Sequence, residues 1–194
     1  SISPETTALR GTIMVMDPSS TENADDFAWG VIGFANAQLF LLDIGTLGSL
    51  EETALEDLAR VCIKWKVSTL YDEINYAGGM FRSLFQPILK RVCDKAEWRC
   101  GFSPKGYRRK PGLSKNNYII SILDQLLSQN RLITTRAVIE KDNGYRRKGL
   151  SEELSRTYRL FYQLTHITVE GGTLLHDDRV DMLAIGAEYW APSM

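Results

Sequence analysis

The sequence predicts an α/β fold in which helices flank a mixed central sheet. A continuous apolar run at residues 12–16 is typical of a strand that is buried on both faces. Residues 26–34 and 38–44 have the pattern of two further strands with a tight turn between them. An amphipathic helix at residues 50–65 then precedes a short apolar strand at residues 67–71. This strand, helix, strand order predicts parallel pairing between the first strand and the last one.

Apolar residues at helical spacing continue along the second half of the chain. Two adjacent glycines, Gly78 and Gly79, interrupt the chain before the first of these helices, and Pro87 within that helix predicts a kink. The expected elements are a helix at residues 80–95, a short strand at 98–102, helices at 115–129 and 152–164, a turn or short strand at 166–175, and a C-terminal helix that starts near residue 177.

The length of 194 residues is that of one domain with its own core. We expect residues 1–10 to form an N-terminal tether and residues 11–194 to form a single domain. No apolar run is long enough to cross a bilayer, so no membrane partner is predicted. None of the three cysteines has the Cys-x-x-Cys spacing of a zinc site, and we interpret them as reduced thiols of a cytoplasmic protein.

The net charge of −1 conceals an uneven distribution. Residues 82–115 contain ten Lys and Arg against only Asp94 and Glu97, so the rest of the chain is acidic. A nearly neutral total that is divided in this way suits a protein that holds a metal in one region and a polyanion in another.

The start of the C-terminal helix carries three aspartates. Because a helix advances about 100° per residue, Asp177, Asp178 and Asp181 fall within one arc roughly 100° wide. Clustered carboxylates raise one another's pKa, and such a cluster usually persists where a cation neutralises it. The alternative is that Asp177 caps the helix while the other two favour its positive end.

Two more acids follow predicted strands. Asp17 follows the first strand and Glu73 follows the strand at residues 67–71, so parallel pairing predicts both at the same edge of the sheet. Hard cations such as Mg²⁺ take oxygen ligands, and two such ions about 4 Å apart can hydrolyse a phosphodiester. The structural alternatives are a turn-forming Asp17 and a solvated Glu73. His176 adjoins the acids and is a candidate for a supporting or proton-transfer role.

Two basic segments share the sequence Gly-Tyr-Arg-Arg-Lys, and each precedes a helix that begins at Ser. Arginines can donate to DNA phosphates while tyrosines pack along the sugars, without reading base sequence. The alternative is a pair of solvated turns that are alike by chance. The candidate DNA-binding residues are Lys105, Tyr107, Arg108, Arg109 and Lys110 in the first segment, and Tyr145, Arg146, Arg147 and Lys148 in the second.

Three motifs together resemble the C-terminal nuclease domain of the large terminase subunit of tailed bacteriophages. They are Met-Val-Met-Asp-Pro-Ser at residues 14–19, Leu-Tyr-Asp-Glu-Ile-Asn at 70–75, and His-Asp-Asp-Arg-Val-Asp-Met-Leu-Ala at 176–184. The resemblance extends from about residue 10 to residue 190. It implies a ribonuclease H-like fold and a metal-dependent endonuclease. This enzyme would cut concatemeric double-stranded viral DNA in the host cell cytoplasm during packaging. The resemblance also implies the portal, the small terminase subunit and the terminase ATPase domain as partners.

The resemblance assigns roles to the acids. Asp17, Glu73 and Asp178 would be the catalytic metal ligands for Mg²⁺ or Mn²⁺, with Asp177 and Asp181 as candidates for the second of two ions. Motif position alone does not decide between Asp177 and Asp178. The sequence has no Gly-x-x-x-x-Gly-Lys-Ser/Thr phosphate loop, so the ATPase motor of these subunits is absent and the nuclease half alone is expected.

Two other functions remain open at this stage. One is another ribonuclease H-like nuclease, such as a junction resolvase or a transposase. The other is a non-catalytic module that binds DNA or docks on the portal and whose acids hold a structural ion.

Overall fold

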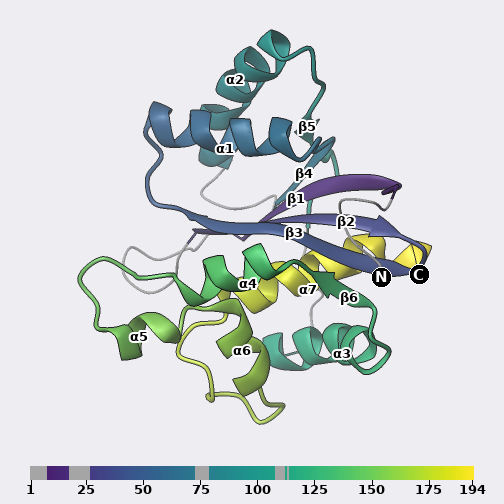
Figure 1. Cartoon of the computed structure of the whole chain (residues 1–194), viewed down its shortest axis with the longest axis vertical. Helices are drawn as coiled ribbons and strands as arrows, with labels where there is room; N and C mark the ends of the chain where they lie inside the picture. The colour runs from purple at the N-terminus through teal and green to yellow at the C-terminus, as the bar shows by residue number, and fades with distance from the viewer. Residues whose placement is uncertain (1–7, 18–26, 73–78, 108–111, 113) are drawn as a thin grey trace.

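The computed structural model describes residues 8–17, 27–72, 79–107, 112 and 114–194. The described residues form three layers, with a sheet between two groups of helices (Figure 1). The strands are β1 (Gly11–Asp17), β2 (Phe27–Ala35), β3 (Gln38–Leu47), β4 (Thr69–Asp72), β5 (Gly101–Phe102) and β6 (Leu132–Thr134). Their order across the sheet is β5-β4-β1-β2-β3-β6.

The sheet is mixed, as predicted. β1, β2 and β3 form an antiparallel meander, whereas β4 pairs parallel to β1, β5 parallel to β4 and β6 parallel to β3. Asn36 and Ala37 form the turn between β2 and β3 with φ values of 51° and 59°. A two-residue turn with positive φ at both positions matches the twist of a hairpin, which explains the tight connection.

Helices cover both faces of the sheet. α1 and α2 lie on one face, and α3, α4, α6 and α7 lie on the other (Figure 1). The helices are α1 (Glu52–Lys64), α2 (Met80–Lys95), α3 (Lys115–Ser128), α4 (Arg136–Asn143), α5 (Glu152–Arg156), α6 (Leu160–His166) and α7 (Asp178–Trp190). α2 continues through Pro87, and β6 and α4 were not expected from the sequence.

The single helix expected at residues 152–164 is wrong, because the chain forms α5 and α6 there. Arg159 between them has extended backbone angles, with φ −75° and ψ 139°. The carboxylate of Asp142, at the end of α4, accepts hydrogen bonds from the backbone N–H groups of Leu160 (2.8 Å) and Phe161 (3.0 Å). This carboxylate satisfies the first amides of α6, so a new helix starts at this point.

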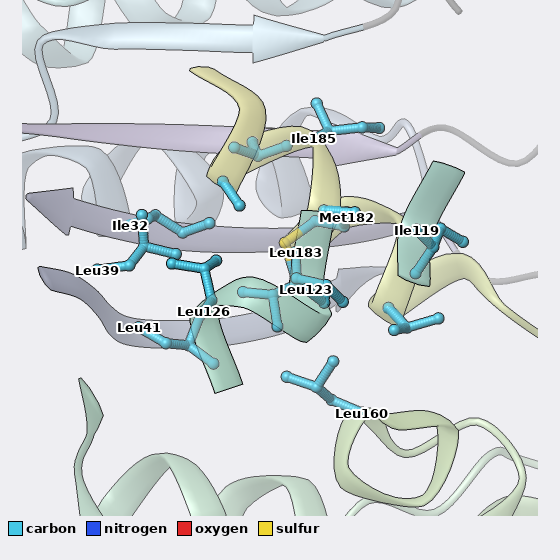
Figure 2. Close-up of a cluster of buried hydrophobic side chains, with 14 of the residues drawn as sticks. Ile32, Leu39, Leu41, Ile119, Leu123, Leu126, Leu160, Met182, Leu183 and Ile185 are labelled. Atoms are coloured by element: carbon cyan, nitrogen blue, oxygen red, sulfur yellow. The ribbon is translucent and has the colours of Figure 1, made fainter. Parts of the chain in front are cut away.

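Each face of the sheet has its own hydrophobic core. In β1, Ile13 and Val15 face the cluster formed with α3 and α7, while Met14 and Met16 face the cluster formed with α1 and α2. This alternation explains why the whole strand is apolar. Figure 2 shows part of the first cluster, with Ile32, Leu39, Leu41, Ile119, Leu123, Leu126, Leu160, Met182, Leu183 and Ile185 labelled.

Helix α7 packs unusually close to the sheet. A Cβ atom at Gly186 would lie 2.2 Å from Cδ1 of Ile32 and 3.1 Å from Cγ2 of Val15, so only glycine permits this approach. Residues 178–187 are buried on every side of the helix. The carboxylates of Asp178 and Asp181 therefore lie inside the protein, whereas that of Asp177, just before α7, is partly exposed.

The described N-terminal residues already contact the sheet. The Arg10 N–H donates to the Phe34 carbonyl over 2.8 Å, and the Leu9 side chain lies over Gly33. Ordered structure therefore begins before residue 11, and residues 1–7 of the expected tether lie outside the described residues. All three cysteines are free thiols, as predicted. No helix in the described ranges has the length and hydropathy needed to span a membrane.

Candidate active site

Asp17 and the end of β4 lie at the same edge of the sheet. In the parallel ladder between β1 and β4, Met16 pairs with Asp72, and Asp17 is the last residue of β1. The two strands therefore end together, as the sequence predicts. Glu73 follows Asp72 and lies outside the described residues, so its expected position beside Asp17 stays a prediction.

Lys115, the first residue of α3, pairs with two acids at the start of α7. Its Nζ lies 2.6 Å from Oδ1 of Asp177 and 3.0 Å from Oδ2 of Asp181, whose side chain is fully buried. Burial alone would lower the pKa of Lys115, but the carboxylates of Asp181, Asp177 and Asp17 raise that pKa above its ordinary value. Two predicted site acids thus contact one ammonium group, and the charge of a third, Asp17, also acts on it.

Asp177 does not cap α7, so the alternative role considered for it is wrong. It occupies the N-cap position with φ −134° and ψ 7°, and its side chain makes no capping hydrogen bond. Its carboxylate binds Lys115 instead. The capping role falls to Gln163 of α6, whose Oε1 accepts from the backbone N–H groups of Arg179 (3.1 Å) and Val180 (3.0 Å).

Asp178 is held by Gln163 of α6. Its side chain is buried, and its Oδ1 accepts a hydrogen bond of 3.0 Å from Nε2 of Gln163. The same amide therefore caps the helix and contacts the carboxylate that the motif assigns to metal binding.

A buried ion pair supports the start of α7. Nη1 of Arg179 lies 3.1 Å from Oδ1 of Asp142, and both side chains are almost fully buried. Asp142 also holds the first amides of α6, as described above. The pair thereby joins α4, α6 and α7, and these contacts offset the cost of burying two charges.

The donor set suits a hard divalent cation. Within the described ranges, no three His, Cys, Asp or Glu side chains gather closely enough to form a ready-made metal site. However, Asp17, Asp177 and Asp181 already act on the Lys115 ammonium, and all of them offer oxygen. Oxygen ligands around a positive charge are what Mg²⁺ and Mn²⁺ require.

The tyrosine of the first basic segment, Tyr107, is buried, although it was expected to contact DNA. Tyr107 is 2% exposed and packs against Tyr118, with ring centroids 6.0 Å apart, and its N–H donates to the Asp72 carbonyl over 2.8 Å. Its expected contact with DNA sugars is therefore wrong, because backbone pairing with Asp72 turns the ring into the core. Lys105 is exposed, while residues 108–110 lie outside the described residues.

In the second basic segment, two cations face the solvent. Lys148 is exposed, and Arg146 is exposed while forming an ion pair with Glu152 of α5. Exposed ion pairs of this kind contribute little to stability and can exchange partners. Both side chains therefore remain candidates for contact with phosphates.

The other residues of this segment connect it to the acids. The Arg147 guanidinium lies 4.5 Å from the ring centroid of Tyr158, which stacks on His176 at 3.7 Å. The Arg179 guanidinium lies 4.0 Å from the ring centroid of Tyr145. Cation–π and stacking contacts of this kind fix the segment against the residues around the start of α7. His176, expected beside the acids, is half-buried at the end of this stack.

Sequence reasoning missed four residues of this region: Lys115, Asp142, Gln163 and Arg179. Lys115, Asp142 and Arg179 carry no local signal, because their partners are distant in sequence. Gln163 did carry one, since it lies three residues after Leu160 and one before Leu164 in an otherwise apolar helical pattern. A polar residue on an inward face requires a buried partner.

We expect Lys115→Met to destabilise the protein by about 2 kcal/mol in EDTA, because it leaves two carboxylates without their shared cation. Millimolar Mg²⁺ should restore part of this loss by replacing the lost charge. Urea denaturation with and without Mg²⁺ measures both effects. Lys90→Met is the matched control, since Lys90 pairs with Asp94 at an exposed site. Equal, small losses for both variants would contradict a neutralising role for Lys115.

Comparison with solved structures defines the class of fold. The human cytomegalovirus terminase nuclease domain, soaked with Mn and bound to an inhibitor, matches with a TM-score of 0.58 and 13% sequence identity, covering 94% of this chain and 83% of its own. The Mn-soaked domain of the same protein matches with a TM-score of 0.57, the same identity and the same coverage. At this identity the likeness shows the fold alone.

Sequence comparison defines the family. Residues 16–132 match the family described as Terminase Bacteriophage T7, Ribonuclease H-like domain, and the chain belongs to this family. The large terminase subunit of Enterobacteria phage T3 is 31% identical over 195 residues, which cover 100% of this chain. The chain spans 31% of the length of that relative. The predicted ribonuclease H-like fold and the terminase resemblance are confirmed.

Proposed function

We propose that this chain is the nuclease domain, residues 11–194, of a phage terminase large subunit that cleaves concatemeric double-stranded DNA during genome packaging. The observation that carries this proposal is the contact of Asp177 and Asp181 with one cation, Lys115, on which the charge of Asp17 also acts from the edge of the sheet where β1 and β4 end. The alternative is a non-catalytic module that binds DNA or docks on the portal and whose acids hold a structural ion, and the cleavage assay below distinguishes it from a nuclease. Terminase family membership supports the nuclease.

The acids divide into two proposed groups. Asp17, Glu73 and Asp178 hold the first Mg²⁺ or Mn²⁺, and Asp177 and Asp181 contribute to the second. When bound, the two ions supply an activated water and stabilise charge on the phosphodiester. The Mn soak of the human cytomegalovirus nuclease domain supports a divalent ion in this fold.

The chain's own cations and its histidine complete the proposed site. Lys115 neutralises Asp177 and Asp181 in the protein without metal, which keeps like charges together at low cost. His176, which stacks on Tyr158 and precedes Asp177 in the sequence, would support the acids or move a proton to the leaving oxygen. Neither role requires a contact with the bases of the DNA.

The basic residues are proposed to hold the DNA backbone. Lys105, Arg108, Arg109 and Lys110 of the first segment and Arg146, Arg147 and Lys148 of the second would neutralise phosphates without reading sequence. Arg147, fixed on Tyr158, would set the distance between the backbone and the acids. The proposed partners beyond DNA are the ATPase domain, the portal and the small terminase subunit, in the host cell cytoplasm.

Replacing Arg146 and Lys148 together by Ala should weaken binding to unrelated duplexes equally. Each lost phosphate contact flattens the slope of log K against log salt by about 0.9, so the expected change is about 1.8. Fluorescence anisotropy across a salt series measures it. The double change of Arg60 and Lys90, exposed on α1 and α2 across the sheet, is the control. An unchanged slope for the Arg146 and Lys148 variant would exclude this segment from the DNA path.

Incubation of supercoiled plasmid with the protein tests the function itself. Mg²⁺ or Mn²⁺ should support nicking and linearisation, and Ca²⁺ should support little cutting because its looser coordination positions water poorly. EDTA should abolish the reaction. Cutting that survives thorough chelation would contradict the proposed mechanism, and DNA binding without cutting in any metal would favour the non-catalytic module.

A further inference from the structure

We infer that Gln163 is a positioning residue that orients the Asp178 carboxylate for metal binding. This inference rests on the proposed function, because it concerns a ligand of the proposed metal site. Gln163 is fully buried on α6, and its amide contacts both the backbone at the start of α7 and the Asp178 side chain.

The pattern of hydrogen bonds fixes which way the amide points. Two backbone N–H groups, of Arg179 and Val180, point at one end of the side chain, so that end must be the oxygen. The nitrogen then faces Oδ1 of Asp178 at 3.0 Å and the Thr157 carbonyl at 3.3 Å. The amide therefore donates to Asp178 in one defined orientation.

Hydrogen bonds of Asp142 join the helices around Gln163. The Asp142 carboxylate holds the first amides of α6 and also pairs with Arg179 of α7. Gln163 thus bridges two helices that Asp142 already holds together. A buried amide in such a frame cannot follow a moving carboxylate, so it restricts the rotation of the Asp178 side chain.

A helix cap alone would not require a glutamine from a second helix that also contacts Asp178. Ser114, Thr135 and Ser151 cap α3, α4 and α5 from within their own segments, whereas α7 receives its cap from another helix. The capping residue for α7 also contacts the carboxylate that the terminase motif assigns to metal. Supporting contacts of this kind typically change metal affinity or activity by about 10- to 100-fold.

The test is the Mn²⁺ affinity of Gln163→Met, measured by electron paramagnetic resonance on the full chain well below its melting temperature. Met is similar in size but neither donates nor accepts, so we expect the Mn²⁺ dissociation constant to rise by about 10-fold or more. Thr135→Ala, which removes the cap at the opposite end of α4 from Asp142, is the stability control and should bind Mn²⁺ as the wild type does. A melting temperature that falls in both variants, with unchanged Mn²⁺ affinity in both, would reduce Gln163 to a cap and overturn the inference.

A second measurement needs no variant to fold. In ¹H–¹⁵N spectra of the wild type, the side-chain amide of Gln163 should shift during Mg²⁺ titration with the same dissociation constant as the site. An unchanged Gln163 side-chain signal at saturating Mg²⁺ would also overturn the inference. If the wild type binds neither ion, the proposed function fails and the inference fails with it, whereas normal ion binding that is insensitive to Gln163 removes the inference alone.

Discussion

Asp178→Asn is expected to reduce metal-dependent cleavage by at least about a thousandfold, because loss of a metal ligand removes several kcal/mol of transition-state stabilisation. The fold should remain, since Asn keeps an oxygen that can accept from Nε2 of Gln163. Melting temperature in EDTA should hold or rise as repulsion among the acids decreases. Plasmid cleavage rates and thermal unfolding in EDTA measure the two effects. The same loss of cleavage is expected for Asp17→Asn and Glu73→Gln.

Asp94→Asn is the control for these variants, since Asp94 is an exposed carboxylate paired with Lys90 on α2. It should cleave like the wild type. Wild-type cleavage by any one of the three site variants would remove that residue from the site. A large fall in melting temperature in EDTA would instead assign the residue a structural role.

Asp142→Ala is expected to have the largest effect on stability, a loss of about 3–5 kcal/mol. The change leaves the Arg179 guanidinium buried without its carboxylate and removes the acceptor for the first two amides of α6. Urea denaturation, analysed at constant slope, measures the free energy of unfolding.

The control for Asp142→Ala is Asp57→Ala, which breaks an exposed ion pair with Arg60 and should cost less than about 1 kcal/mol. Similar small losses for the two variants would show that the buried pair does not hold α4, α6 and α7 together. Cleavage by Asp142→Ala should also fall, because Gln163 and the start of α7 depend on the same support.

The parts of the fold that were predictable depend on local pattern. The apolar run of β1, the turn at Asn36 and Ala37, and the helical spacing in α1, α2 and α3 each report a nearby environment. The division between α5 and α6 was not predictable, because its cause is the carboxylate of Asp142, 18 residues before Leu160. β6 has only three residues, too few to give a periodic signal.

The site shows the same limit. The place of Asp17 at the end of a buried strand could be predicted, and so could the place of the aspartates at the start of α7, but their roles stay predictions. Lys115 could not be predicted, because its partner Asp177 is 62 residues away. Tyr107 was misread, since an aromatic residue in a basic segment has the same sequence pattern whether its ring points to solvent or, as here, into the core.

The most direct test of the central claim is an anomalous difference map from a crystal of this chain soaked with Mn²⁺. We expect Mn²⁺ peaks at the carboxylates of Asp17, Glu73 and Asp178, with a second peak toward Asp177 and Asp181. Protein that cleaves plasmid with Mn²⁺, yet whose crystals show Mn²⁺ bound only at other residues, would contradict the claim that these acids form the nuclease centre.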